Sequence, residues 1–115
     1  MKKRKGKYFV HLYNKKNGCF YVEEREGYII TTDCGIHFGC TKGKGGWNVT
    51  EITTGYRCIV NECPTNMDAL LTYIGYITPV VQRCLQMPCR EDEITRFHSL
   101  IAEYHKSTSD EEVQV

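Results

Sequence analysis

A chain of 115 residues with 41% hydrophobic and 25% charged residues fits one globular domain, which excludes two independent cores and wholesale disorder. The formal net charge of +1 is unevenly placed, because five of the first seven residues are cationic and the remainder is mildly acidic, which argues against a general nucleic-acid binder. No apolar run reaches the ~18 residues that cross a bilayer, and no apolar stretch of a secretory signal follows the basic start. We therefore expect a cytoplasmic protein with no membrane or long nucleic-acid partner.

The first half of the chain shows the twofold alternation of side chains that is typical of β-strands. Asn17 and Gly18 supply the positive φ angles of a tight hairpin between the first two predicted strands. A charged turn at residues 23–27, a turn at residues 33–35 and a glycine-rich loop separate the next ones. The pattern predicts an antiparallel meander of about six short strands, at residues 8–13, 19–22, 28–32, 36–40, 47–52 and 56–60.

The hydrophobic period changes to that of an α-helix after Pro64. Thr65 is the expected N-cap. Asp68, three residues later, takes the place of the acidic partner in a capping box. The apolar residues recur at alternating spacings of three and four and comprise Met67, Leu70, Ile74, Ile77, Val81 and Cys84. Pro79 lacks an amide donor and clashes with the preceding turn, so we expect either a kink or two helices, with Thr78 capping the second.

A further helix is predicted after Pro88. It opens with Glu91, Asp92 and Glu93, whose carboxylates suit the positive end of a helix dipole. Its apolar stripe consists of Ile94, Phe97, Ile101 and Tyr104. Residues 107–115 are polar and acidic and are predicted to form a disordered tail. The basic residues 1–7 are predicted to form an arm that either solubilises the chain or contacts phosphate.

The elements together predict an α+β fold. Residues 8–106 form a single domain, an antiparallel β-meander followed by two C-terminal helices packed on one sheet face. The other face would then stay free, and it would carry aromatic side chains from several strands. An uncovered aromatic sheet face commonly lies in a subunit interface or under a ligand. We therefore expect a homo-oligomer, at least a dimer.

Seven cysteines are many for this length, and no two of them form a C-x-x-C pair. Zinc sites and dithiol redox motifs usually contain such a pair, and disulfides are rare in the cytoplasm. We expect reduced, largely buried thiols, with no metal and no other cofactor. A metal site and a disulfide are the alternatives.

The glycine-rich loop at residues 41–47 is a candidate phosphate cradle, because Lys42 and Lys44 supply charge and the glycines free backbone amides to face one anion. Trp47 closes the loop. The spacing is not that of a P-loop, and no helix follows. The alternative is a flexible hairpin loop.

Two arginines are further candidates. Arg57 lies in the last predicted strand beside Tyr56, where a guanidinium can stack on a base and bind phosphate; the alternative is a pair with Glu51 across the hairpin. Arg96 flanks the apolar stripe of the last helix, where it could clamp phosphate; the alternative is a surface pair with Asp92.

A catalytic constellation is missing from the sequence. None of the common serine-hydrolase, metalloprotease or deaminase motifs is present, and the four histidines lie far apart with no carboxylate at a telling spacing. A cysteine nucleophile paired with histidine is the open alternative. We expect a binding protein and not an enzyme.

The run Trp47-Asn-Val-Thr-Glu-Ile-Thr-Thr-Gly55, the following Tyr56-Arg57 and the helix that starts near Met67 resemble the first-described family of phage anti-Thoeris signal sponges. The resemblance spans residues 8–106 in length and element order, but the basic arm has no counterpart. It implies an oligomeric, non-enzymatic protein that sequesters cyclic ADP-ribose variants made by TIR-domain enzymes, and some members also hold cyclic oligonucleotides in a separate pocket. It also implies that Arg57 and Arg96 contact phosphate.

The expected function is therefore the sequestration of a cyclic nucleotide immune signal without cleavage. Such a ligand requires aromatic faces for adenine, a few cations or amides for phosphate, and enclosure. The expected ligand-binding residues are Arg57, Arg96, Lys42, Lys44, Tyr56 and Trp47. Alternatives are an inhibitor that binds a host defence enzyme, as anti-CRISPR proteins do, and a plain interaction domain of a mobile element.

Overall fold

The computed structural model describes residues 1–58 and 64–114, with side chains up to Thr108. Residues 59 and 60 of the last predicted strand, and Cys63, lie outside the described residues. No helix in the described part is both long enough and apolar enough to span a membrane.

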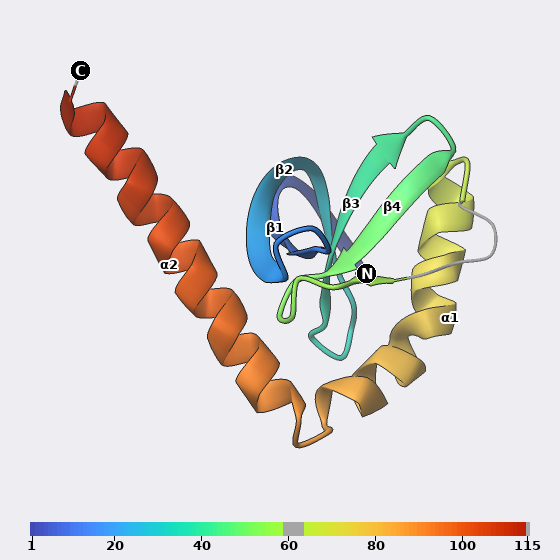
Figure 1. Ribbon diagram of the computed structural model, residues 1–115. Coiled ribbons are helices and arrows are strands. Elements are labelled where there is room, and N and C mark those ends of the chain that lie inside the picture. The colour runs from blue at the N-terminus through green and yellow to red at the C-terminus, as the bar shows by residue number, and fades with distance from the viewer. Residues whose placement is uncertain (59–63, 115) are drawn as a thin grey trace.

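Five antiparallel strands form one sheet in the order β1-β2-β3-β4-β5, followed by two helices (Figure 1). The strands are β1 (Lys2–Asn14), β2 (Cys19–Thr31), β3 (His37–Gly43), β4 (Gly46–Glu51) and β5 (Arg57–Cys58). The predicted α+β class and the meander are confirmed. The described strands are fewer than expected because residues 23–27, predicted as a turn, continue β2 and pair with residues 6–10 of β1.

The basic N-terminal residues are part of the sheet. Lys2 pairs with Thr31 and Lys7 with Glu26, and the ammonium of Lys3 lies 5.2 Å from the ring centroid of Tyr28. The prediction of a separate arm at residues 1–7 was wrong, because this segment finds backbone partners along the second half of β2. The backbone that carries these cations is therefore fixed along an edge strand.

The long β1–β2 hairpin coils back over β3. Strand pairing places Tyr8 on the same sheet face as Gly39 and Thr41, and the Tyr8 hydroxyl forms a hydrogen bond with the Thr41 hydroxyl. A Cβ at Gly39 would lie 2.5 Å from the Tyr8 ring, so only glycine permits this approach. The amide of His11 also donates to the carbonyl of Gly55 at 2.8 Å. Part of the sheet face that was expected to stay free is therefore covered by the chain's own first strand.

Helix α1 (Met67–Leu85) covers the opposite face of the sheet. The core between them consists of Ile30, Ile36, Phe38, Cys40, Trp47, Val49, Leu70 and Ile74. The N-cap is Asn66, not the expected Thr65, since the Asn66 side chain accepts the amide of Ala69 at 2.8 Å. One continuous helix passes through Pro79 and bends around the sheet (Figure 1), so the expected kink is present and the alternative of two helices is not.

Helix α2 (Arg90–Gln114) diverges from α1 and packs on β1 (Figure 1). The ring of Phe97 stacks on His11, and Tyr104 meets Phe9 edge to face with centroids 5.2 Å apart. Strand alternation puts Phe9 and His11 on the face that α1 also covers, so both helices lie on one face of the coiled sheet, as expected. The helix continues to Gln114, so the prediction of a disordered tail at residues 107–115 was wrong up to that residue.

The six described cysteines are unpaired thiols. Only Cys40 is buried, while Cys19, Cys34 and Cys89 are exposed, so the expectation of largely buried cysteines was wrong for this part of the chain. The three exposed thiols lie in turns or at strand ends, where sequence periodicity gives no measure of burial.

Candidate functional site

Arg96 and Tyr56 are brought together by the fold, although they lie on different elements. The guanidinium of Arg96 donates to the Tyr56 hydroxyl at 2.9 Å and to Nε2 of His11 at 3.3 Å, and it lies 3.6 Å from the ring centroid of Phe20. The alternative pair with Asp92 is not formed. Arg96 thus anchors α2 to the sheet, so its loss would weaken this attachment.

His11 is the centre of this contact and is only 4% exposed. Its ring stacks between the rings of Tyr56 and Phe97. The ring centroids lie 4.9 Å and 5.2 Å from that of His11, with interplanar angles of 4° and 21° respectively. Nδ1 lies 3.2 Å from the carbonyl oxygen of Thr54, which can only accept, so Nδ1 carries the proton and Nε2 accepts from Arg96. Burial lowers the pKa of His11, and the neighbouring Arg96 charge lowers it further against the opposing effects of Thr54 and Glu93.

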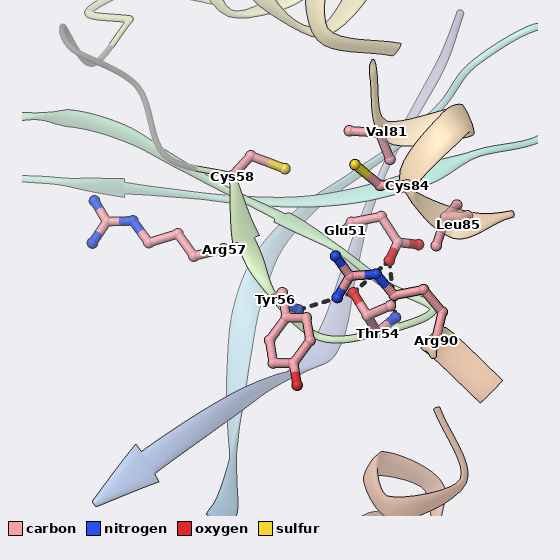
Figure 2. Close-up of a pocket in the computed structure, with 9 residues that line it drawn as sticks. All are labelled: Glu51, Thr54, Tyr56, Arg57, Cys58, Val81, Cys84, Leu85 and Arg90. Atoms are coloured by element: carbon pink, nitrogen blue, oxygen red, sulfur yellow. Dashed lines mark hydrogen bonds between the residues drawn. The ribbon is translucent and has the colours of Figure 1, made fainter. Parts of the chain in front are cut away.

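Arg57 lies apart from Arg96. It is exposed and donates to Asn48 Oδ1 at 2.6 Å, on the sheet face opposite to Cys58. Arg57 does not pair with Glu51, its alternative partner. The Glu51 carboxylate instead accepts hydrogen bonds from the amides of residues 53 and 54 and from the hydroxyl of Thr54. Figure 2 shows Arg57 directed away from Tyr56 and Arg90.

The glycine-rich loop forms the β3–β4 hairpin and does not join the arginines into one site. Lys42 and Lys44 are exposed there. Trp47 is 8% exposed in the hydrophobic core, and its backbone amide donates to the carbonyl of Pro64 at 2.8 Å. The six residues singled out from the sequence therefore do not form one site.

A narrow cleft of about 170 Å³ opens between the β4–β5 turn and the junction of the two helices (Figure 2). We call it the hinge cleft; it is lined by Glu51, Thr54, Tyr56, Arg57, Cys58, Val81, Cys84, Leu85 and Arg90. Arg90 pairs with Glu93 at 2.5 Å. Burial raises the pKa of Cys58 to about 11, so at neutral pH its thiol is almost entirely protonated and a poor nucleophile.

A larger hollow of about 300 Å³ lies between the β1–β2 hairpin and α2. We call it the α2 bowl; its lining comprises Arg4, Lys7, Tyr8, Phe9, Ile29, His37, Ile52, Phe97 and Ile101. Six of these side chains are apolar or aromatic, three are basic, and none is acidic. Its volume reaches the lower end of the ~300–1,000 Å³ typical of small-molecule sites, which the hinge cleft does not.

The basic groups of the α2 bowl come from distant parts of the sequence. Arg4 forms no ion pair or hydrogen bond with the described residues, and the exposed Lys7 pairs with the half-buried Glu24 at 3.7 Å. His37 Nδ1 lies 2.7 Å from the Thr31 hydroxyl, which orients the ring. Phosphate contact by Arg4 and Lys7 was one of the two roles expected of the basic residues 1–7, whereas no local pattern pointed to His37 or placed β3 beside them.

The described residues contain no group of three histidine, cysteine or acidic side chains arranged to hold a metal ion. No family model matches the chain, and no curated protein or solved structure is significantly similar to it.

Proposed function

We propose that the protein binds a small phosphate-bearing nucleotide in the α2 bowl and holds it without chemical change, which is the action of a signal sponge in the host cytoplasm. The observation that carries this proposal is the combination of three basic groups with an apolar and aromatic floor, free of acidic side chains. Such a surface accommodates the two unlike parts of a nucleotide, a planar base and a phosphate.

The charges of the bowl favour an anion over a neutral ligand. Arg4 has no carboxylate partner among the described residues, so a bound phosphate would not have to displace one. The Lys7–Glu24 pair is long, at 3.7 Å, and its lysine is exposed, so the pair contributes little to stability and Lys7 can turn toward a ligand at small cost.

The floor of the bowl suits a planar group. Phe9, Phe97 and Ile101 belong to β1 and α2, and Phe97 is 2% exposed and held in place by its stack on His11. Aromatic side chains fixed in this way contribute apolar area without losing rotamer freedom on binding. The ligands expected from the sequence, cyclic ADP-ribose isomers and cyclic oligonucleotides, belong to this chemical class.

Calorimetry with cyclic ADP-ribose isomers, linear ADP-ribose and cyclic trinucleotides tests the proposal, with Arg4→Ala as the site variant. Loss of a charge-assisted contact to phosphate costs ~1.5–3 kcal/mol, so we expect affinity to fall roughly ten- to hundredfold. Arg57→Ala is the matched control, because Arg57 is also exposed but lies outside the bowl. The ligand recovered after heat denaturation should have its original mass.

Each other outcome has a distinct meaning. Loss of binding in Arg57→Ala but not in Arg4→Ala would move the site to the hinge cleft. An altered ligand mass would show that the protein is an enzyme. The absence of heat with every nucleotide would reject the sponge and leave the inhibitor of a host defence enzyme as the hypothesis to test.

A further inference from the structure

The outer surface of α1 has an unusual composition for an exposed helix. Between Asp68 and Arg83 the helix carries no charged residue. The positions that point away from the core recur at helical spacing and are all exposed; they are Asp68, Thr72, Gly75, Tyr76, Pro79 and Arg83. Val80, beside them, is 50% exposed. A helix face that stays exposed to solvent normally carries charged side chains. The lack of charge on this face of α1 therefore favours its burial against an uncharged surface.

Tyr76 is the centre of this face and is 83% exposed, the highest value among the large hydrophobic residues that are exposed. Beside it, Gly75 leaves a gap where an added Cβ would meet only the end of Met1 at 3.6 Å. Gly75 and Met1 also line a shallow hollow of about 330 Å³ together with Thr78. The same surface therefore presents a projecting ring and, next to it, an open depression.

We propose that this face of α1 is the docking surface for α1 of a second copy of the chain, packed antiparallel about a twofold axis. This inference goes beyond the proposed function and does not depend on it. In a twofold contact the same patch serves both partners, so a projection and a depression on one surface can fill each other. Tyr76 of each copy then enters the depression at Gly75 of the other.

The charges at the two ends of the helix select the partner and its direction. The midpoint between Asp68 and Arg83 falls between Gly75 and Tyr76, so an antiparallel pair centred there sets each Asp68 opposite the other copy's Arg83. Neither side chain forms an ion pair with the described residues. A parallel pair would instead bring like charges together, which costs free energy.

The bend of α1 limits the strength of this dimer. Because α1 curves around the sheet (Figure 1), its outer face is convex, and two such helices would touch mainly near their middles. Asp68 and Arg83 lie near the ends of the helix, so they face the partner's opposite charges across a wider gap than the residues at the centre. They therefore determine the relative orientation of the two helices more than the affinity of the dimer. A contact smaller than the usual ~800 Å² per partner gives a weak dimer, with a dissociation constant on the order of micromolar.

Sedimentation from about 1 to 300 µM spans the expected micromolar range and tests the dimer without nucleotide. Tyr76→Ser should raise the dissociation constant at least about tenfold. Tyr21→Ser, which removes an exposed tyrosine from β2, should leave it unchanged. A wild-type chain that stays monomeric throughout, or a Tyr76→Ser variant that dimerises like wild type, overturns the proposal.

A charge swap separates self-docking from any other use of this face. Asp68→Arg and Arg83→Asp should each weaken the dimer at low salt, because each places like charges opposite one another. The double variant restores opposite charges and should recover the wild-type dissociation constant. Circular dichroism verifies that each variant folds, and a folded double variant that fails to recover contradicts the antiparallel arrangement.

Discussion

At the scale of single residues, His11 decides how α2 is attached. It lies on β1, accepts a hydrogen bond from Arg96 of α2, and donates to the carbonyl of Thr54. Its ring is held between Tyr56 and Phe97, so the imidazole serves as both a stacking surface and a two-sided hydrogen-bonding group. Protonation of Nε2 would turn the acceptor into a donor and bring a second positive charge against Arg96.

The pH dependence of stability follows from this arrangement. The pKa of His11 in the folded protein lies below its ordinary value of 6.5, so the unfolded chain binds the proton more readily. Stability from His11 is thus fully present above pH 6.5 and is lost as the pH falls through the lowered folded pKa. Urea unfolding at pH 7.5 and at stepwise lower pH measures the loss, which His11→Gln should reduce. An equal loss in the variant would assign it to other groups.

At the scale of elements, the coil of the β1–β2 hairpin gives the sheet its shape. Two strands of thirteen residues each are long enough to twist through a large angle, and the middle of β1 then lies over β3. The approach is closest where Tyr8 covers Gly39. The same coil brings Arg4 and Lys7 to the edge where α2 passes and so creates the α2 bowl.

Substitution of Gly39 by alanine tests this close approach. The added Cβ would lie 2.5 Å from the aromatic ring of Tyr8, which is itself buried and cannot move aside. Overpacking of this kind costs typically ~1–3 kcal/mol, so Gly39→Ala should lower the free energy of unfolding by about that amount. Gly45→Ala is the control, because a Cβ there meets no atom within 4 Å. Equal stabilities of the two variants in urea would contradict the described coil.

At the scale of the whole molecule, the two helices serve different parts of one sheet. Helix α1 closes the hydrophobic core, whereas α2 rests on the aromatic side chains of β1 and supplies one wall of the α2 bowl. A ligand in the bowl would contact Phe97 and Ile101 directly. Occupancy of the bowl should therefore strengthen the attachment of α2 and leave α1 unaffected.

Hydrogen exchange with and without a bound nucleotide tests this coupling. Backbone amides of residues 94–102 should exchange more slowly in the complex, because the ligand must leave before the middle of α2 detaches. Amides of residues 70–82 in α1 provide the internal comparison and should exchange at the same rate in both states. Equal protection of both helices would mean global stabilisation and would not support a site beside α2.

The sequence by itself determined the α+β class, the antiparallel meander and the positions of both helices. These properties depend on local patterns, the periods of two and 3.6 residues and the turns between them, which are present before any long-range contact forms. It also indicated the bend of α1 (Figure 1), since the missing amide is a property of Pro79 alone. The apolar stripe containing Phe97 was predicted for the same reason.

Only the tertiary structure decided where the candidate site lies. Residues 23–27 are charged and end in glycine, as a turn would be, yet pairing with β1 holds them in a strand. Arg96 is separated from His11 by 85 residues, and no local pattern shows that their side chains meet. Arg4, Lys7 and His37 form one rim because the hairpin coils and the strands pair. Such contacts depend on the direction of side chains across distant strands, which periodicity alone does not specify.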